Sequence, residues 1–157
     1  MASGKLIGAL VLAASAWAGA SASSKIMVTT TPSLSHRVFY MRAISHGAMP
    51  KKGDYVIVHA SSMYIDDGKP FDMTKRVACV PNQELRVKGR RYFCDGAYLG
   101  EAKERSLKRE PLKNFIFNGS IPAERLFLMG DGKDSFDSRY LGFVKVDDVK
   151  TIVYPIF

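Results

Sequence analysis

Short apolar segments, rich in β-branched residues and separated by turn residues, constrain the fold of this chain most strongly. Pro32 and Pro81 end two of the segments, and Lys88-Gly89-Arg90 predicts a hairpin turn after Arg86–Val87. Only residues 102–109 have helical character. Because 157 residues fit one domain and nearly half are apolar, we expect a single mainly β domain over residues 25–157. The expected strands are Lys25–Thr31, Asp54–Ala60, Thr74–Val80, Arg91–Cys94, Arg125–Met129, Tyr140–Val146 and Thr151–Tyr154.

The segment Leu6–Ala22 carries no charge and predicts one hydrophobic helix within residues 1–24. As a helix it would span roughly 25 Å, slightly less than the ~30 Å core of a bilayer. Ala20-Ser21-Ala22 fits the cleavage pattern of a removable signal peptide. The alternative is a signal anchor that is retained. Both interpretations export residues 25–157 across a membrane.

The formal net charge of +8 arises largely from basic residues between Arg86 and Lys113. Few aromatic residues alternate with them, and the sequence contains no nucleic-acid-binding motif. We therefore expect no nucleic-acid partner. A solvated surface explains the charge, and contact with anionic membrane lipid is the second explanation.

The chain contains two cysteines, Cys79 and Cys94. In an exported domain they can form a disulfide, and the alternative is two free buried thiols. Two cysteines at this spacing, with three scattered histidines, match no set of metal ligands. We expect neither a metal nor another cofactor.

Two serines and one lysine are candidates for chemistry. In an extended chain, Ser33 and Ser35 point to the same face. Alternation places Lys75 on the face of Met73 and Val77, where an ammonium is costly unless it is paired or neutral. A neutral lysine can act as a general base. Read separately, the serines could be ordinary loop residues and the lysine could extend along the sheet to solvent.

The order of these features resembles the signal peptidase I family. A Ser-x-Ser follows the export segment, then come Gly-Asp-Tyr-Val-Ile-Val from Gly53, Lys-Arg-Val-Ala-Cys-Val-Pro from Lys75, and the box Ile121–Val144. The resemblance covers residues 31–144. The Ser-Phe-Asp-Ser-Arg-Tyr form and the small size are most similar to the conjugative-transfer, TraF-type branch, which processes pilin precursors. The resemblance implies an antiparallel β-sheet peptidase domain on the bacterial inner membrane, facing the periplasm.

The resemblance also implies a role for each matching residue. Ser35 would be the nucleophile and Lys75 the neutral base that accepts its proton. Ser33 would contribute its hydroxyl, beside the backbone N–H of Ser35, to an oxyanion hole. Ser135 would orient Lys75. Asp137 and Arg139 would form an ion pair, and as residues two apart on an extended strand they could meet on one face.

Several positions depart from the family pattern. His36-Arg37 follows Ser35 where Met and Pro are usual, Cys79 and Asn82 stand where Gly is common, and Gly132 replaces Asn. A Ser35/His36 mechanism is disfavoured because adjacent residues of an extended chain point to opposite faces. A catalytically inactive exported β-domain that binds a partner and a general type I signal peptidase remain as alternatives. A self-cleaving repressor peptidase would need a DNA-binding domain where this chain has an apolar segment.

Overall fold

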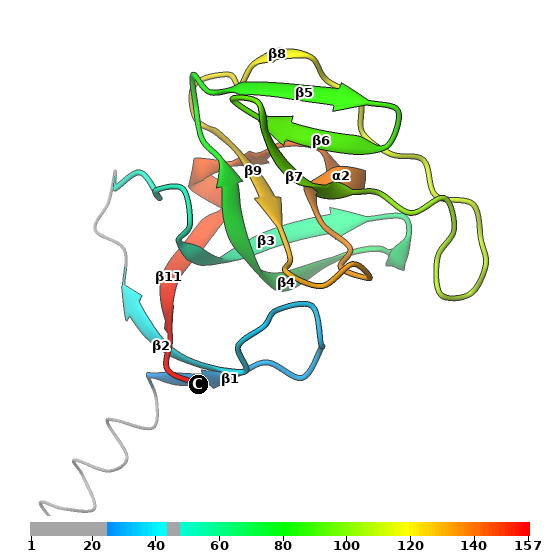
Figure 1. Ribbon diagram of the computed structural model, residues 1–157. Helices are drawn as coiled ribbons and strands as arrows, with labels where there is room; N and C mark the ends of the chain where they lie inside the picture. Colours follow the sequence, from blue (N-terminus) through cyan, green and yellow to red (C-terminus); the bar gives the residue numbers. More distant parts are fainter. Residues whose placement is uncertain (1–24, 44–47) are drawn as a thin grey trace, which may run out of the picture.

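Two antiparallel sheets form the structure, which was obtained as a computed structural model and describes residues 25–43 and 48–157 (Figure 1). The expected leader at residues 1–24 lies outside the described residues. The larger sheet has seven strands, in the spatial order β1 (Ile26–Val28), β2 (Val38–Ala43), β11 (Val149–Pro155), β3 (Tyr55–Ser62), β4 (Ile65–Cys79), β9 (Arg125–Met129) and β10 (Val144–Lys145). The smaller sheet has the order β7 (Ala97–Glu101), β6 (Arg91–Cys94), β5 (Glu84–Lys88) and β8 (Gly119–Ser120). The expected mainly β fold is confirmed.

Strand β4 connects the two sheets because its end leads directly into β5 (Figure 1). Alternation along β4 sends Met73 and Val77 into one core cluster and Ala78 into another, and a register shift between Val77 and Cys79 lets Cys79 join Ala78. The second cluster also takes Leu85 and Tyr92 from the smaller sheet. The core between the two sheets therefore contains residues from β4 in the larger sheet and from β5 and β6 in the smaller sheet.

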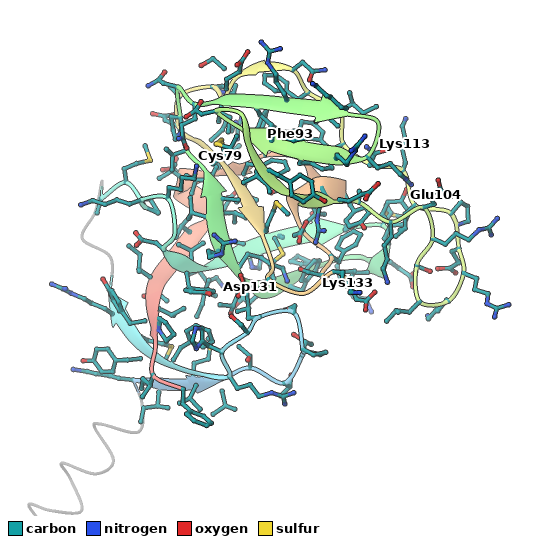
Figure 2. The ribbon with its side chains drawn as sticks, viewed as in Figure 1. Cys79, Phe93, Glu104, Lys113, Asp131 and Lys133 are labelled. Carbon is teal, nitrogen blue, oxygen red and sulfur yellow. A yellow bond between two sulfur atoms is a disulfide. The ribbon has the colours of Figure 1, made fainter. Side chains whose placement is uncertain are left out.

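A disulfide joins Cys79 at the end of β4 to Cys94 at the end of β6, with their Cα atoms 5.9 Å apart (Figure 2). Both cysteines are fully buried in the cluster between the sheets. The structure therefore resolves the choice that spacing left open. The bond links one strand of each sheet.

The expected helix at residues 102–109 is wrong, because this segment is an irregular loop. The Ser106 hydroxyl accepts hydrogen bonds from the backbone N–H groups of Lys108 and Glu110. Such local bonds offer the backbone an alternative to a helix. Arg109 also has a φ of 65°, outside the helical range.

The expected strand Tyr140–Val146 is also partly wrong. A short helix, α2 (Ser138–Leu141), occupies its beginning, and only Val144–Lys145 pair as β10. Asp137 caps α2, since its side chain accepts a hydrogen bond from the Arg139 N–H. A 3-10 turn, η1 (Val146–Asp148), then leads into β11. Among the described residues, no helix has the length and apolarity needed to cross a bilayer.

Candidate active site

Lys75 lies in the middle of β4 with only 5% of its surface exposed. The neighbouring Arg76 is partly exposed, so the alternation expected from the sequence is present. Burial lowers the pKa of Lys75, and the nearby Arg139 lowers it further, against the raising effects of Asp137 and Asp131. The environment therefore favours the neutral amine, the form that can accept a proton.

A cleft of about 560 Å³ contains Lys75 together with Ser33 and Ser135. Most of its wall is apolar, and the lining residues come from β1, from β4 and from three loops, at residues 29–33, 107 and 134–136. The other lining residues include Met27, Val28, Thr31, Pro32, Ile65, Phe71, Met73, Leu107 and Phe136. An apolar wall around a few polar groups is typical of a binding site.

Gly130 marks the point where these groups converge. Arg76 pairs with Met129 across β4 and β9, so one further step of the register places Lys75 opposite Gly130. A Cβ on Gly130 would lie 2.6 Å from the Ser33 carbonyl oxygen and would also collide with the Ser135 hydroxyl. Only glycine fits where the Ser33 backbone, the Ser135 side chain and the turn after β9 meet.

The Ser135 hydroxyl is buried and has no hydrogen-bond partner among the described residues. A buried polar group without a partner costs about 1–3 kcal/mol. Because Ser135 and Lys75 line the same cleft, the amine is available as a partner for this oxygen. The expectation that Ser135 orients Lys75 stays a prediction, since the two groups share a cleft without a hydrogen bond between them.

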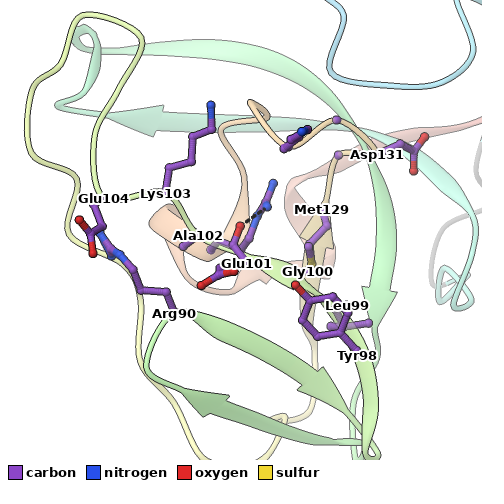
Figure 3. Close-up of a pocket in the computed structure, with 14 residues that line it drawn as sticks. Arg90, Tyr98, Leu99, Gly100, Glu101, Ala102, Lys103, Glu104, Met129 and Asp131 are labelled. Atoms are coloured by element: carbon purple, nitrogen blue, oxygen red, sulfur yellow. Dashed lines mark hydrogen bonds between the residues drawn. The ribbon is translucent and has the colours of Figure 1, made fainter.

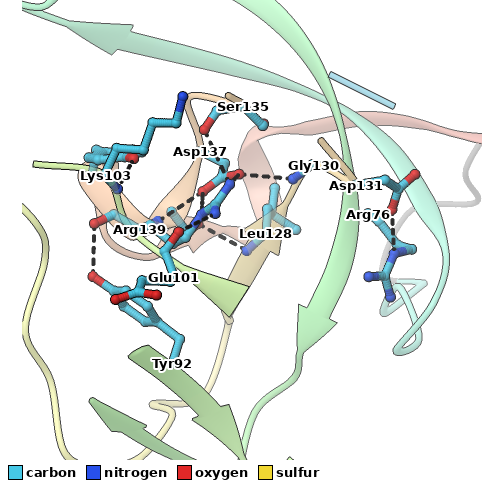
Figure 4. A network of polar contacts seen from close by, with 12 residues as sticks. Arg76, Tyr92, Glu101, Lys103, Leu128, Gly130, Asp131, Ser135, Asp137 and Arg139 are labelled. Atoms are coloured by element: carbon cyan, nitrogen blue, oxygen red, sulfur yellow. Dashed lines mark hydrogen bonds and ion pairs between the residues drawn. The ribbon is translucent and has the colours of Figure 1, made fainter. Parts of the chain in front are cut away.

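Ser35 is held at a different place, by the carboxylate of Asp131. Its hydroxyl donates to Asp131 Oδ2 at 2.9 Å, and its backbone N–H donates to the same oxygen at 3.1 Å. The Tyr55 hydroxyl also donates to Oδ2, and Arg76 Nε donates to Oδ1 at 3.0 Å. Figure 4 shows the Arg76–Asp131 contact on the far side of β4 from Ser135. Ser35 is absent from the residues that line the Lys75 cleft.

The contacts of Asp131 determine its charge. Burial alone would raise the pKa of its carboxyl group, but the hydrogen bonds from Ser35, Arg76 and Tyr55 outweigh burial and lower it. Burial chiefly raises the pKa of the Tyr55 hydroxyl. At neutral pH the cluster therefore contains a carboxylate with donors on both oxygens.

Asp137 and Arg139 form the expected ion pair, and both are almost completely buried (Figure 4). Arg139 Nη2 lies 2.8 Å from Asp137 Oδ2, and Nε lies 2.9 Å from Oδ1. The backbone that brings the two side chains together differs from the expected strand, because it turns into α2 at this point. Asp137 also accepts the Gly130 N–H at 2.9 Å, so the pair fixes the residue opposite Lys75.

Sequence reasoning missed the roles of Asp131, Tyr55 and Arg76. One sequence signal could have revealed them. Arg76 follows Lys75 and Asp131 follows Gly130, and adjacent residues in extended segments point to opposite faces. That pattern places a charged pair on the opposite side of the strands from the amine.

A second pocket of about 620 Å³ lies between the smaller sheet and the turn after β9 (Figure 3). Tyr98, Leu99, Met129 and Arg139 are among its lining residues, and none of the expected reacting groups is. Arg139 is already bound there, since its Nη1 donates to the Glu101 carbonyl at 2.7 Å. In the described part of the chain, no group of three or more His, Cys, Asp or Glu side chains could hold a metal ion.

Comparison with known proteins identifies the family. The model of the family described as signal peptidase, peptidase S26, matches residues 3–156. The chain belongs to this family. Signal peptidases of the S26 family are serine peptidases that act on precursor proteins and are typically membrane-associated.

The other comparisons give less detail than the S26 family match. One similar solved structure is a signal peptidase I from Enterococcus faecalis, which is 24% identical over 68% of this chain and 98% of that chain, with a TM-score of 0.44. No curated protein matches the chain significantly.

Proposed function

We propose that this S26 peptidase is a Ser/Lys endopeptidase that removes leader peptides from exported precursors, cutting after small residues. The observation that carries the proposal is the buried Lys75 amine, which shares a cleft with serine hydroxyls and is favoured in its neutral form by burial. A neutral amine in an apolar cleft can remove the proton of a serine that attacks a peptide carbonyl. His36 and Arg37, which stand where the family usually has Met and Pro, do not change Lys75 as the proposed base.

We further propose that the enzyme belongs to the conjugative-transfer branch and matures a pilin precursor at the periplasmic face of the inner membrane. The resemblance of the Ser-Phe-Asp-Ser-Arg-Tyr segment and the small size of the chain support this proposal. The disulfide between Cys79 and Cys94 agrees with an oxidising compartment. The apolar segment 6–22 would keep the enzyme at the membrane, as an anchor, if it is retained.

Replacement of Lys75 by Met tests the proposed base. The variant keeps the length of the side chain but has no proton acceptor, so we expect precursor cleavage to fall by at least about 1,000-fold. The matched control is Lys52→Met, which changes an exposed lysine in the turn before β3 and should cleave like the original enzyme. Cleavage is followed by the mass of the product. Full activity of Lys75→Met would contradict the proposal.

The same assay distinguishes the substrate classes. A pilin precursor and a general secreted precursor are incubated in parallel with the full chain. Preferential cleavage of the pilin supports the conjugative branch, and equal cleavage supports a general signal peptidase. The product mass also shows whether the new terminus is free or joined to the other end of the pilin.

A further inference from the structure

We infer that Ser33 is the nucleophile that reacts with Lys75, and that Ser35 is a positioning residue which holds the nucleophile's loop on Asp131. This inference rests on the proposed Ser/Lys function and changes its reacting oxygen. It begins with the lining of the cleft, where Ser33 and Lys75 occur together and Ser35 does not. The two serines are separated by one residue, Leu34, whose side chain is buried against Phe39 and Val153. The core therefore anchors the segment between them.

The contacts of Ser35 conflict with a nucleophilic role. A serine nucleophile must give its proton to the base as it attacks. The Ser35 hydroxyl instead donates to the Asp131 carboxylate at 2.9 Å, in a cluster that Arg76 and Tyr55 complete. The carboxylate is a poor proton acceptor, because its hydrogen bonds lower its pKa. The Ser35 N–H is also bound to Asp131, so it is not free to bind an oxyanion.

The backbone contacts of Ser33, unlike those of Ser35, place it in the cleft of Lys75, the base that must accept the proton of the nucleophile. The Gly132 N–H donates to the Ser33 carbonyl at 3.1 Å, and a Cβ on Gly130 would clash with that carbonyl. The β4–β9 register, continued by one residue beyond the Arg76–Met129 pair, places Gly130 opposite Lys75. The Ser33 backbone thus rests on the turn that faces the amine. Ser135 reaches the same point with a hydroxyl that has no hydrogen-bond partner in the described part of the chain.

Thr31 places a second hydroxyl beside the one on Ser33, where it can donate to an oxyanion. Its Oγ1 lies 3.3 Å from Ser33 Oγ, and both residues line the cleft. If the nucleophile is Ser33 and not Ser35, the hydroxyl two residues before it, which would bind the oxyanion, belongs to Thr31 and not to Ser33. Thr31 Oγ1 and the backbone N–H of Ser33 then become the donors for the developing negative charge.

The reaction balances with these groups alone. Ser33 Oγ attacks the carbonyl carbon of the scissile peptide and its proton passes to the neutral Lys75 amine. The C–N bond then breaks, and the Lys75 ammonium returns the proton to the leaving amine. Lys75 then takes a proton from a water molecule, whose oxygen attacks the ester carbonyl carbon on Ser33. The acyl C–O bond to Ser33 Oγ breaks, the Lys75 ammonium returns the proton to Ser33 Oγ, and the new carboxyl terminus is released.

Ser35 and Asp131 have a separate task in this arrangement. The Asp131 carboxylate accepts two hydrogen bonds from Ser35 across 96 positions of the sequence, and binds Arg76 on the strand that carries Lys75. It therefore ties the loop of the nucleophile to the strand of the base. Figure 2 shows Asp131 where the β1–β2 loop approaches the end of β9.

The test compares Ser33→Ala with Ser35→Ala in the full chain, using cleavage of an exported precursor and covalent labelling by a serine-acylating probe. We expect Ser33→Ala to lose at least about 1,000-fold in kcat, as expected for loss of a nucleophile. We expect Ser35→Ala to lose no more than about tenfold, which corresponds to one hydrogen bond. Fragmentation of the labelled peptide should place the adduct on residue 33. Thermal unfolding confirms that each variant is folded.

The outcomes separate the inference from the proposed function. A probe adduct on residue 35, or cleavage that survives Ser33→Ala and is lost in Ser35→Ala, would overturn the inference and leave a Ser/Lys peptidase in place. Full activity in both variants would overturn the proposed function itself. If both variants are inactive, the labelled residue in the original enzyme decides.

The positioning role of Ser35 has its own measurements. Ser35→Ala and Asp131→Asn should lower kcat to a similar extent, and their combination should add little, because the two residues act through one contact. Ser35→Thr, which keeps the hydroxyl, should restore most of the kcat. Additive losses, or no rescue by threonine, would show that Ser35 does not act through Asp131.

Discussion

Lys75 shows at the level of one residue how function and stability oppose each other. It is buried in a mostly apolar cleft, on the strand face of Met73 and Val77, where a charge loses its hydration. The same loss of hydration provides the neutral base that the proposed chemistry requires. A site of this kind is expected to cost the fold some stability.

The cost can be measured by unfolding. The pKa of Lys75 is lowered in the folded chain, so between that pKa and the unfolded value of about 10.4 the unfolded state binds more protons. Stability should therefore rise with pH through this window, and below it the penalty for a buried charge applies in full. We expect Lys75→Met to raise the midpoint of thermal unfolding at pH 7 by a few degrees, since about 1 kcal/mol corresponds to about 2–4 °C in a domain of this size.

The control for this measurement is again Lys52→Met, whose lysine is exposed and should leave the midpoint unchanged. The gain in Lys75→Met should also shrink as the pH rises towards about 10.4 and beyond, where the original amine becomes neutral in the unfolded state as well. A Lys75→Met protein that is less stable than the original at pH 7 would show that the amine is satisfied in the folded state.

At the level of elements, β4 shows how far sequence patterns predict this site. The two-residue alternation identified the buried face of Lys75, because period 2 holds wherever a strand is regular. The first half of the strand was missed, since Asp67-Gly68 reads as a turn within it. Asp67 and Gly68 do turn, with φ values of 53° and 82°, and the β3–β4 register skips residues 66–69 between the paired Ile65 and Pro70.

Other elements of the site could not be predicted from local patterns. Which serine meets Lys75 depends on how the β1–β2 loop rests on the turn at Gly130–Gly132, almost 100 positions away. The ion pair of Asp137 and Arg139 was expected, but the helix that brings them together was not, because only four residues form it. Such short elements depend on tertiary contacts and not on propensity.

The buried pair makes α2 a structural anchor, and Asp137→Asn tests it. The change keeps the shape of the side chain but leaves the Arg139 guanidinium buried without its counter-ion. We expect a loss of about 3–5 kcal/mol in the free energy of unfolding, the range for breaking one partner of a buried pair. Denaturant unfolding at pH 7 measures it.

Glu84→Gln is the matched control, because Glu84 pairs with Arg86 on the surface with both side chains about half exposed. An exposed pair contributes about 0–1 kcal/mol, so this variant should unfold almost like the original. Equal losses in Asp137→Asn and Glu84→Gln would mean that the buried pair has no special role.

At the level of the whole molecule, the two sheets have different roles. The larger sheet carries Lys75 on β4 and Ser33 in the loop after β1. The smaller sheet lies above β4 and β9 in the view of Figure 1. Strand β4 enters the shared core just beyond Lys75, at Ala78 and Cys79. The position of the proposed base therefore depends on how firmly the two sheets are joined.

The disulfide is the covalent part of that joint, and its removal should weaken the domain without removing the site. It closes a loop across a separation of 15 residues, which corresponds to about 3 kcal/mol in the chain-entropy model. We expect the double variant Cys79→Ala/Cys94→Ala to lose about this amount in denaturant unfolding. The original chain should lose a similar amount in reductant, whereas the variant should not respond to reductant.

At temperatures well below its unfolding midpoint, the variant should still cleave precursor, because neither cysteine lines the Lys75 cleft. Unchanged stability would show that the apolar cluster between the sheets holds them together without the bond.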